Sequence, residues 1–353
     1  MIGLLFHGPE VFDSGWAQKV IRILEPLDAV RCVLAGTMGR TAVFDSGLEE
    51  IEFWDQMPGA CLKELSRATD MVIIVNFGKS VESGLVFGGM VVDRTRVNTP
   101  VVQVECAGPF WVEWRSGCPS SIINLLARLG FSQMEKIEIK PSVWDENGRV
   151  YRRMTTAEAG DFVLVNGIMV GWATGDEVVM ACENGHLCEI KGVDVKAHGI
   201  EKLDRLGGVD LKAAKLASTP IIRRTGFIRR MVKGSGHGMV FLDHAGMHVY
   251  QLANQAKGVV TVGDDTTVVV ADILSRFDIP VIGIVDGDED VLLKNGSFAS
   301  GSVRLTVLKD DEFGLKVQDA VFGGGKQSDI SFTEALNQIL YLAGNDLVDT
   351  RYF

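Results

Sequence analysis

The chain has 353 residues, of which 46% are hydrophobic and 23% are charged, as in an ordinary globular protein. This length predicts two or three domains. The formal net charge of −11 argues against a general nucleic-acid binder, because phosphate backbones require compensating cations. The sequence shows no basic leader and no apolar run long enough to cross a bilayer, so we expect a cytoplasmic protein with no membrane partner.

Residues 1–134 repeat a pattern of strand, loop and helix. Short apolar runs lie at residues 2–6, 29–35, 71–75 and 100–104, and helix-like segments separate them. This alternation is typical of a parallel sheet with helices on its faces. We predict a Rossmann-like α/β domain with glycine-rich strand ends.

The middle of the chain follows a different pattern. Residues 135–205 alternate apolar and polar positions between turn-forming pairs such as Asn166-Gly167 and Asn184-Gly185, which predicts a small β-rich domain. Residues 206–237 are predicted to form a basic linker, since seven basic and no acidic residues lie between Lys212 and Lys233. Two interpretations of the basic residues stay open, a solvated connection and a clamp for phosphate.

Residues 238–353 predict a second, acidic α/β domain. Apolar runs at residues 239–242, 259–262 and 281–285 each end in acidic residues. Successive strands of a right-handed βαβ unit are parallel, so their carboxyl ends lie along one edge of the sheet. The predicted fold class is α/β, with two parallel-sheet Rossmann-like domains and the small β-rich domain inserted between them.

Carboxylates at these strand ends should converge into a cation site. Carboxylates that converge repel one another, which raises their pKa values or calls for a cation such as Mg²⁺. The alternative is that each aspartate only forms a turn or caps a helix. The candidate metal ligands are Asp243, Asp264, Asp265, Asp286 and Asp288.

The same stretch is similar in pattern to TOPRIM domains. In those domains an acidic residue ends one strand and an Asp-x-Asp pair ends a later one, and together they hold Mg²⁺ for phosphoryl chemistry. The resemblance gives Asp243 the first place and Asp286 with Asp288 the pair. His244 and His248, which lie four residues apart beside these acids, are the candidate general bases.

The strand ends of the first domain predict a ligand site of a different kind. Glycine-rich strand ends expose backbone N–H groups, and two cationic side chains lie among them, so an anionic small molecule is the expected ligand. The alternative is that the glycines only make tight turns. The candidate ligand-binding residues are His7, Glu10, Thr37, Arg40, Thr41, Lys79 and Ser80.

The runs His7-Gly8-Pro9-Glu10, Gly36-Thr37-Met38-Gly39-Arg40 and Asn76-Phe77-Gly78-Lys79-Ser80 carry a second resemblance. The chain resembles a conserved archaeal family, found mainly in methanogens, to which no function is assigned. The resemblance covers the first domain best and the whole chain more loosely. It implies an archaeal cytosolic protein and no particular catalytic residue.

These features lead to one main hypothesis and two alternatives. The main hypothesis is a protein that binds a phosphate-bearing or otherwise anionic small molecule and a divalent cation, with metal-dependent phosphoryl transfer or hydrolysis as the reaction if it is an enzyme. The first alternative is a non-catalytic ligand-binding or assembly protein of archaeal metabolism. The second is nucleic-acid processing through the TOPRIM-like site. Oligomer formation stays open.

Overall fold

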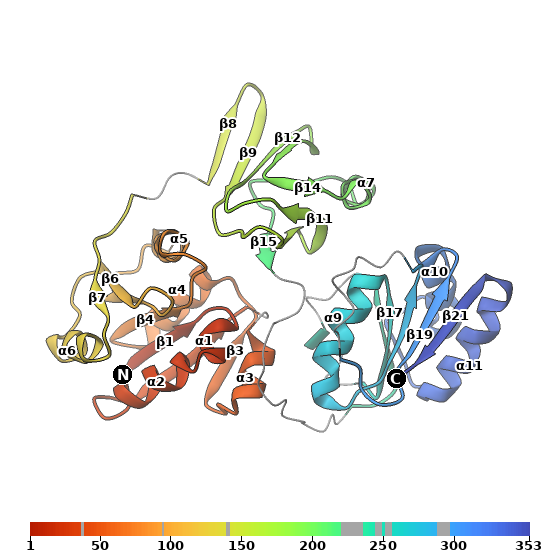
Figure 1. The fold of residues 1–353 in the computed structure, drawn as a ribbon, viewed down its shortest axis with the longest axis horizontal. Coiled ribbons are helices and arrows are strands. Elements are labelled where there is room, and N and C mark those ends of the chain that lie inside the picture. The colour runs from red at the N-terminus through yellow and green to blue at the C-terminus, as the bar shows by residue number, and fades with distance from the viewer. Residues whose placement is uncertain are drawn as a thin grey trace. The chain divides into compact units, whose positions relative to one another are not determined.

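A computed structural model describes residues 1–36, 39–93, 95–138, 142–219, 236–243, 249–250, 256–287 and 297–353 (Figure 1). The chain divides into two compact units. Unit 1 contains Met1–Val163 and Val170–Thr219, and unit 2 contains Leu164–Met169 and the described part of Arg229–Phe353. Both units combine helices with sheets that contain parallel strands, so the predicted mixed α/β class is confirmed.

Unit 1 begins with a seven-stranded sheet of order β3-β2-β1-β4-β5-β6-β7. Strands β1 to β5 are parallel to one another, and β6 is antiparallel to β5. The chain builds outward from β1 to β3 and then returns to place β4 beside β1, so the strand order reverses between β1 and β4. The strands are β1 (Ile2–Phe6), β2 (Val30–Ala35), β3 (Ile51–Trp54), β4 (Met71–Asn76), β5 (Val101–Glu105), β6 (Phe110–Arg115) and β7 (Ser132–Gln133).

Helices pack on both faces of this sheet. Buried side chains of α2 and α6 belong to one core cluster, and those of α4 and α5 belong to the cluster on the other face. All residues of β1, β4 and β5 are buried, as expected for central strands that are covered on both sides. The helices are α1 (Glu10–Asp13), α2 (Trp16–Leu24), α3 (Arg40–Ser46), α4 (Pro58–Ala68), α5 (Val81–Asp93) and α6 (Ser120–Arg128).

Two four-stranded sheets follow, with orders β14-β11-β10-β15 and β13-β12-β9-β8, and their residues belong to unit 1 except for Leu164–Met169 in the β10–β11 hairpin. Asn147, Asn166 and Asn184 each adopt a positive φ before a glycine that also has a positive φ, which is the backbone of a tight hairpin turn. The elements are β8 (Val143–Glu146), β9 (Arg149–Met154), β10 (Phe162–Val165), β11 (Ile168–Ala173), β12 (Val178–Glu183), β13 (His186–Lys191), β14 (Val193–Val195), α7 (Ala197–Arg205) and β15 (Leu216–Thr219).

Unit 2 contains a six-stranded sheet of order β20-β16-β17-β18-β19-β21. The four central strands are parallel, and the outer strands β20 and β21 are antiparallel to their neighbours. The strands are β16 (Met239–Asp243), β17 (Gly258–Val262), β18 (Val281–Val285), β19 (Val303–Val307), β20 (Gln327–Ser328) and β21 (Leu347–Tyr352). The carboxyl ends of the four parallel strands therefore meet at one edge of the sheet, as the sequence predicts.

Helices α10 and α11 cover one face of this sheet, and α9 lies on the other (Figure 1). Ser331 caps α11 in a capping box with Glu334. The helices are α9 (Asp264–Leu274), η2 (Ser275–Phe277), α10 (Asp310–Phe322), α11 (Phe332–Ala343) and η4 (Gly344–Asp346). No helix in the described ranges is long and apolar enough to cross a membrane.

Candidate functional site

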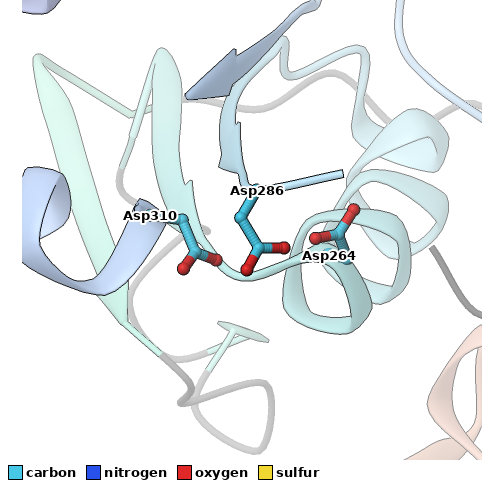
Figure 2. Close-up of side chains that lie close together, drawn as sticks. All are labelled: Asp264, Asp286 and Asp310. Atoms are coloured by element: carbon cyan, nitrogen blue, oxygen red, sulfur yellow. The ribbon is translucent and has the colours of Figure 1, made fainter. Parts of the chain in front are cut away.

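Three aspartates meet at the carboxyl edge of the unit 2 sheet. One carboxylate oxygen from each of Asp264, Asp286 and Asp310 lies within 4.8 Å of the other two. Figure 2 shows Asp286 between Asp310 and Asp264, in the order of the strands that precede them. We call these residues the three-aspartate cluster.

Each aspartate is positioned by the junction after its strand. Asp264 is the first residue of α9, and the preceding Gly263 adopts a φ of 96°, which favours glycine. Asp310 is the first residue of α10, which follows β19. Asp286 comes directly after β18, and the next residue, Gly287, turns the chain away with a φ of 84°.

Two glycines let the helices that carry the outer aspartates approach the sheet closely. A Cβ on Gly283 of β18 would lie 2.2 Å from Cγ2 of Thr267, which is on α9. A Cβ on Gly314 of α10 would lie 2.7 Å from Cγ2 of Val262 on β17. The Thr267 hydroxyl is also hydrogen-bonded to the Thr261 hydroxyl at 2.8 Å. The positions of Asp264 and Asp310 thus depend on the absence of side chains at two points of contact.

The electrostatics of the cluster are those of crowded like charges. The pKa of Asp264 is raised to about 7, first by burial and then by its hydrogen bond to Asp286 and the negative charges of Asp286, Asp310 and Asp265. Asp264 and Asp310 are half-buried, whereas Asp286 is exposed. Such a cluster holds a proton near neutral pH or exchanges it for a cation.

The cluster contains two of the predicted metal ligands and one residue that the prediction lacks. Asp264 and Asp286 converge as expected, and Asp310 is the addition. The sequence contains a cue for Asp310, because the alternating run 303–307 is followed by acidic residues in the same way as the three runs before it. Among the described residues, Asp243 at the exposed end of β16 and half-buried Asp265 do not belong to the group. Asp288, His244 and His248 lie outside the described residues.

The cations predicted to bind an anion in unit 1 are paired with acids. Arg40 is 8% exposed, donates through Nη2 to Asp55, and lies over the ring of Phe53 at 5.0 Å. Lys79 Nζ donates to the carboxylate of Asp161. An anionic ligand would therefore have to compete with a carboxylate for each of these two cations.

The other predicted ligand-binding residues lie in varied surroundings. Thr41 is buried in α3, and Glu10 is exposed at the start of α1. The Ser80 amide donates to Oγ of Ser83, and the Ser83 amide donates to Oγ of Ser80, so this pair closes the turn into α5. Thr37 lies outside the described residues.

A buried polar network occupies the carboxyl edge of the unit 1 sheet. His7 after β1 lies 3.0 Å from Asn76 Oδ1, measured from Nδ1. Asn76 Nδ2 donates to Glu105 Oε2 at 2.7 Å, and Gln103 Nε2 donates to the same oxygen at 3.2 Å. The Gly78 amide donates to the other carboxylate oxygen. We call His7, Asn76, Gln103, Glu105 and Trp114 the β5 network, because β5 supplies its central residues.

The Glu105 carboxylate lies at the strand ends where the sequence predicts a bound anion. Its side chain is 0% exposed, and burial raises its pKa against the opposing hydrogen bonds from Gly78 and Asn76. The amide of Gly78, which was predicted to face an anion, is directed at this internal carboxylate. Glu105 is not among the predicted site residues. Its alternation with Gln103 in the run Val101–Glu105 was the available cue, since both side chains then face the same way.

Comparison with known proteins gives the relationship of the whole chain. A model of a family described as an uncharacterised protein conserved in archaea, DUF2117, matches residues 4–325. The chain belongs to this family. An uncharacterised protein of Methanocaldococcus jannaschii, MJ0065, is 40% identical over 330 residues, which cover 89% of each chain. The comparison with solved structures found no match. Membership of DUF2117 confirms the archaeal resemblance, while the TOPRIM-like pattern stays a prediction.

Proposed function

We propose that unit 2 binds a divalent cation, Mg²⁺ in the first instance, through Asp264, Asp286 and Asp310. The observation that carries the proposal is the convergence of three carboxylates from separate strand ends, with oxygens within 4.8 Å of one another. Oxygen ligands at about 2.1 Å in an octahedral Mg²⁺ site lie about 3 to 4 Å apart. Small side-chain rotations would bring the three oxygens to that spacing.

The reaction we propose is metal-assisted phosphoryl transfer or hydrolysis on a phosphate-bearing substrate. A cation held here would neutralise negative charge that develops on phosphate oxygens. A bound cation would also displace the proton that Asp264 retains near neutral pH, because burial and the neighbouring carboxylates raise its pKa to about 7. His244 and His248 keep their predicted role as candidate bases.

Several finer predictions accompany this proposal. They are the two Rossmann-like domains with the β-rich insert, the boundaries at residues 134, 205 and 237, an anionic ligand in unit 1, and a cytoplasmic location. The TOPRIM-like set differs from the proposed one at two positions, since it uses Asp243 and Asp288 where the cluster uses Asp264 and Asp310. A non-catalytic binding role remains the alternative to the reaction.

Calorimetric titration of Mg²⁺ and of Mn²⁺ tests the cation site and separates the two ligand sets. We expect binding heat with wild type, and its loss in Asp286→Asn and Asp310→Asn because each removes one of three charged ligands. Asp319→Asn, an exposed position on the same helix as Asp310, is the matched control and should bind as wild type does. Equal heats in wild type and Asp286→Asn would refute the proposal. Loss of heat in Asp243→Asn with none lost in Asp310→Asn would favour the TOPRIM-like set.

A further inference from the structure

The directions of the hydrogen bonds in the β5 network follow from two groups, the Trp114 indole, which donates, and the Glu105 carboxylate, which accepts. The indole Nε1–H of Trp114 can only donate, and it lies 2.9 Å from Gln103 Oε1. Gln103 must therefore direct its Nε2 at Glu105 Oε2. Asn76 also presents Nδ2 to that oxygen, which leaves its Oδ1 facing Nδ1 of His7. Since Oδ1 can only accept, Nδ1 of His7 carries the hydrogen.

The chain of bonds therefore fixes one tautomer of His7. With the hydrogen on Nδ1, the neutral imidazole has its lone pair on Nε2. Burial lowers the pKa of His7, and the bond to Asn76 opposes this only in part, so the ring is neutral at pH 7. The ring is held in place by stacking on Phe87, with centroids 4.1 Å apart and planes 22° apart.

The glycines around the network show how closely it is packed. A Cβ on Gly84 would lie 2.4 Å from Glu105 Oε2, and a Cβ on Gly88 would lie 1.8 Å from Gln103 Oε1. Both glycines are in α5, so this helix confines the amide and the carboxylate that orient His7.

We propose that Nε2 of His7 is a fixed hydrogen-bond acceptor for a hydroxyl or amide N–H group of a ligand at the carboxyl ends of β1 and β4. The strand order reverses between these two strands, which is where open α/β sheets place their ligands. Among the described residues, the hydrogen bond found for the His7 ring is the one at Nδ1, and the side chain is half-buried. His7 thus recognises a neutral donor group of the ligand rather than its negative charge. Asn76 and Glu105 are positioning residues, and the inference is independent of the cation site in unit 2.

The first test is the tautomer of His7 in the wild-type protein. Long-range ¹H–¹⁵N correlation spectra distinguish a protonated from an unprotonated ring nitrogen. At pH 7 we expect His7 to show a hydrogen on Nδ1 and a lone-pair shift at Nε2, and titration with sulfate, an anion without a donor hydrogen at this pH, should leave that shift unchanged. Carbethoxylation by diethyl pyrocarbonate, mapped by mass spectrometry, should modify His7 in the folded protein because the reagent needs an accessible lone pair.

A substitution that reverses the bonds gives a sharper test than loss of stability. Because Gln103 also donates to Oε2, the variant combines Glu105→Gln with Gln103→Met, which removes that second donor. In this double variant the Gly78 amide should hold Oε1 of the new side chain at residue 105, so that its Nε2 faces Asn76. Asn76 must then offer Oδ1 to it and Nδ2 to His7, which makes Nδ1 the acceptor and moves the hydrogen to Nε2. We expect the tautomer to switch and carbethoxylation of His7 to fall to background. Glu105→Asp, which keeps a carboxylate, and Glu113→Gln on the neighbouring strand should both retain the wild-type tautomer.

Three results would each overturn the inference. They are a protonated Nε2 in wild type at pH 7, a shift of the Nε2 resonance on addition of sulfate, and an unmodified His7 under conditions that modify exposed His186. An unchanged tautomer in the folded double variant Gln103→Met/Glu105→Gln would also contradict it. If the double variant does not fold, the wild-type spectra and the modification of His7 test the inference without it.

Discussion

The carboxyl edges of the two large sheets both collect acidic and polar side chains at the ends of parallel strands, but their charges are balanced differently. In unit 1, Glu105 receives hydrogen bonds from a backbone amide and two side-chain amides, and the network ends in the Trp114 indole. In unit 2, burial and neighbouring carboxylates raise the pKa of Asp264. A buried acid surrounded by donors orients its neighbours, whereas acids that face one another are suited to bind a cation.

This difference shows why strand-end position alone does not distinguish the roles of acidic residues. Glu105 and Asp286 occupy equivalent places, each at the end of a central parallel strand. Their surroundings decide their chemistry, because donors supplied by the protein replace the cation that a crowded cluster would otherwise need.

Gly88→Ala should damage the β5 network severely. Its Cβ would lie 1.8 Å from Gln103 Oε1 and 2.8 Å from Trp114 Nε1, so either α5 or both polar side chains must move. We expect the free energy of unfolding to fall by about 3 kcal/mol or more, because the site is both overpacked and left with unpaired polar groups. Urea denaturation measures this change.

The matched control is Gly59→Ala in α4. A Cβ there meets its nearest atom, Cγ2 of Thr95, at 3.4 Å, and alanine favours the helix. Stability should stay the same or rise by up to about 1 kcal/mol. Equal losses of stability in Gly59→Ala and Gly88→Ala would show that the close contacts at Gly88 are not the cause of the loss in Gly88→Ala.

Gly283→Ala, at the carboxyl edge of the unit 2 sheet, should reduce stability by less than Gly88→Ala does. The new Cβ would press on Thr267 and push α9, and with it Asp264, away from Asp286. We expect a loss of about 1 to 2 kcal/mol in stability and weaker Mg²⁺ binding by calorimetry. Adding Thr267→Ser removes the Cγ2 that clashes but keeps the hydroxyl, so the double variant should regain most of both. Wild-type Mg²⁺ affinity in Gly283→Ala would contradict this account of the site.

The pH dependence of stability should reveal the crowding in unit 2. Because the pKa of Asp264 is about 7 in the folded state and near 3.8 in the unfolded chain, the folded state binds more protons between these values. The free energy of unfolding in metal-free buffer should therefore fall as the pH rises from about 4 to about 7. Asp264→Asn should lack this component, and Mg²⁺ at pH 8 should recover it in wild type. Parallel pH curves for the two proteins would argue against a raised pKa.

The central strands of both sheets could be predicted because they are continuous apolar runs. Residues 2–6 and 281–285 match β1 and β18, and the turns after Asn166 and Asn184 match the observed hairpins. The strands β3 and β19 were missed, since a short or alternating run resembles a loop or a helix when its neighbours are unknown. Strand order is a tertiary property that the sequence pattern does not contain.

The three-aspartate cluster was predicted only in part, because its full membership depends on strand order. Asp264 and Asp286 could be brought together by the general geometry of βαβ units, but Asp310 required β19 to be placed beside β18. For Arg40 and Lys79, the sequence shows the cation without its partner. Asp55 and Asp161 are respectively 15 and 82 residues further along the chain, so only the fold shows that these charges are paired.

The Glu105 carboxylate affects how a ligand would bind beside the turn that follows β4 in unit 1. Because Glu105 already holds the amide of Gly78, the turn after β4 is shaped by a covalent part of the chain and keeps that shape without any bound molecule. A ligand that docks beside this turn meets a preorganised wall and loses little affinity to the ordering of a loop.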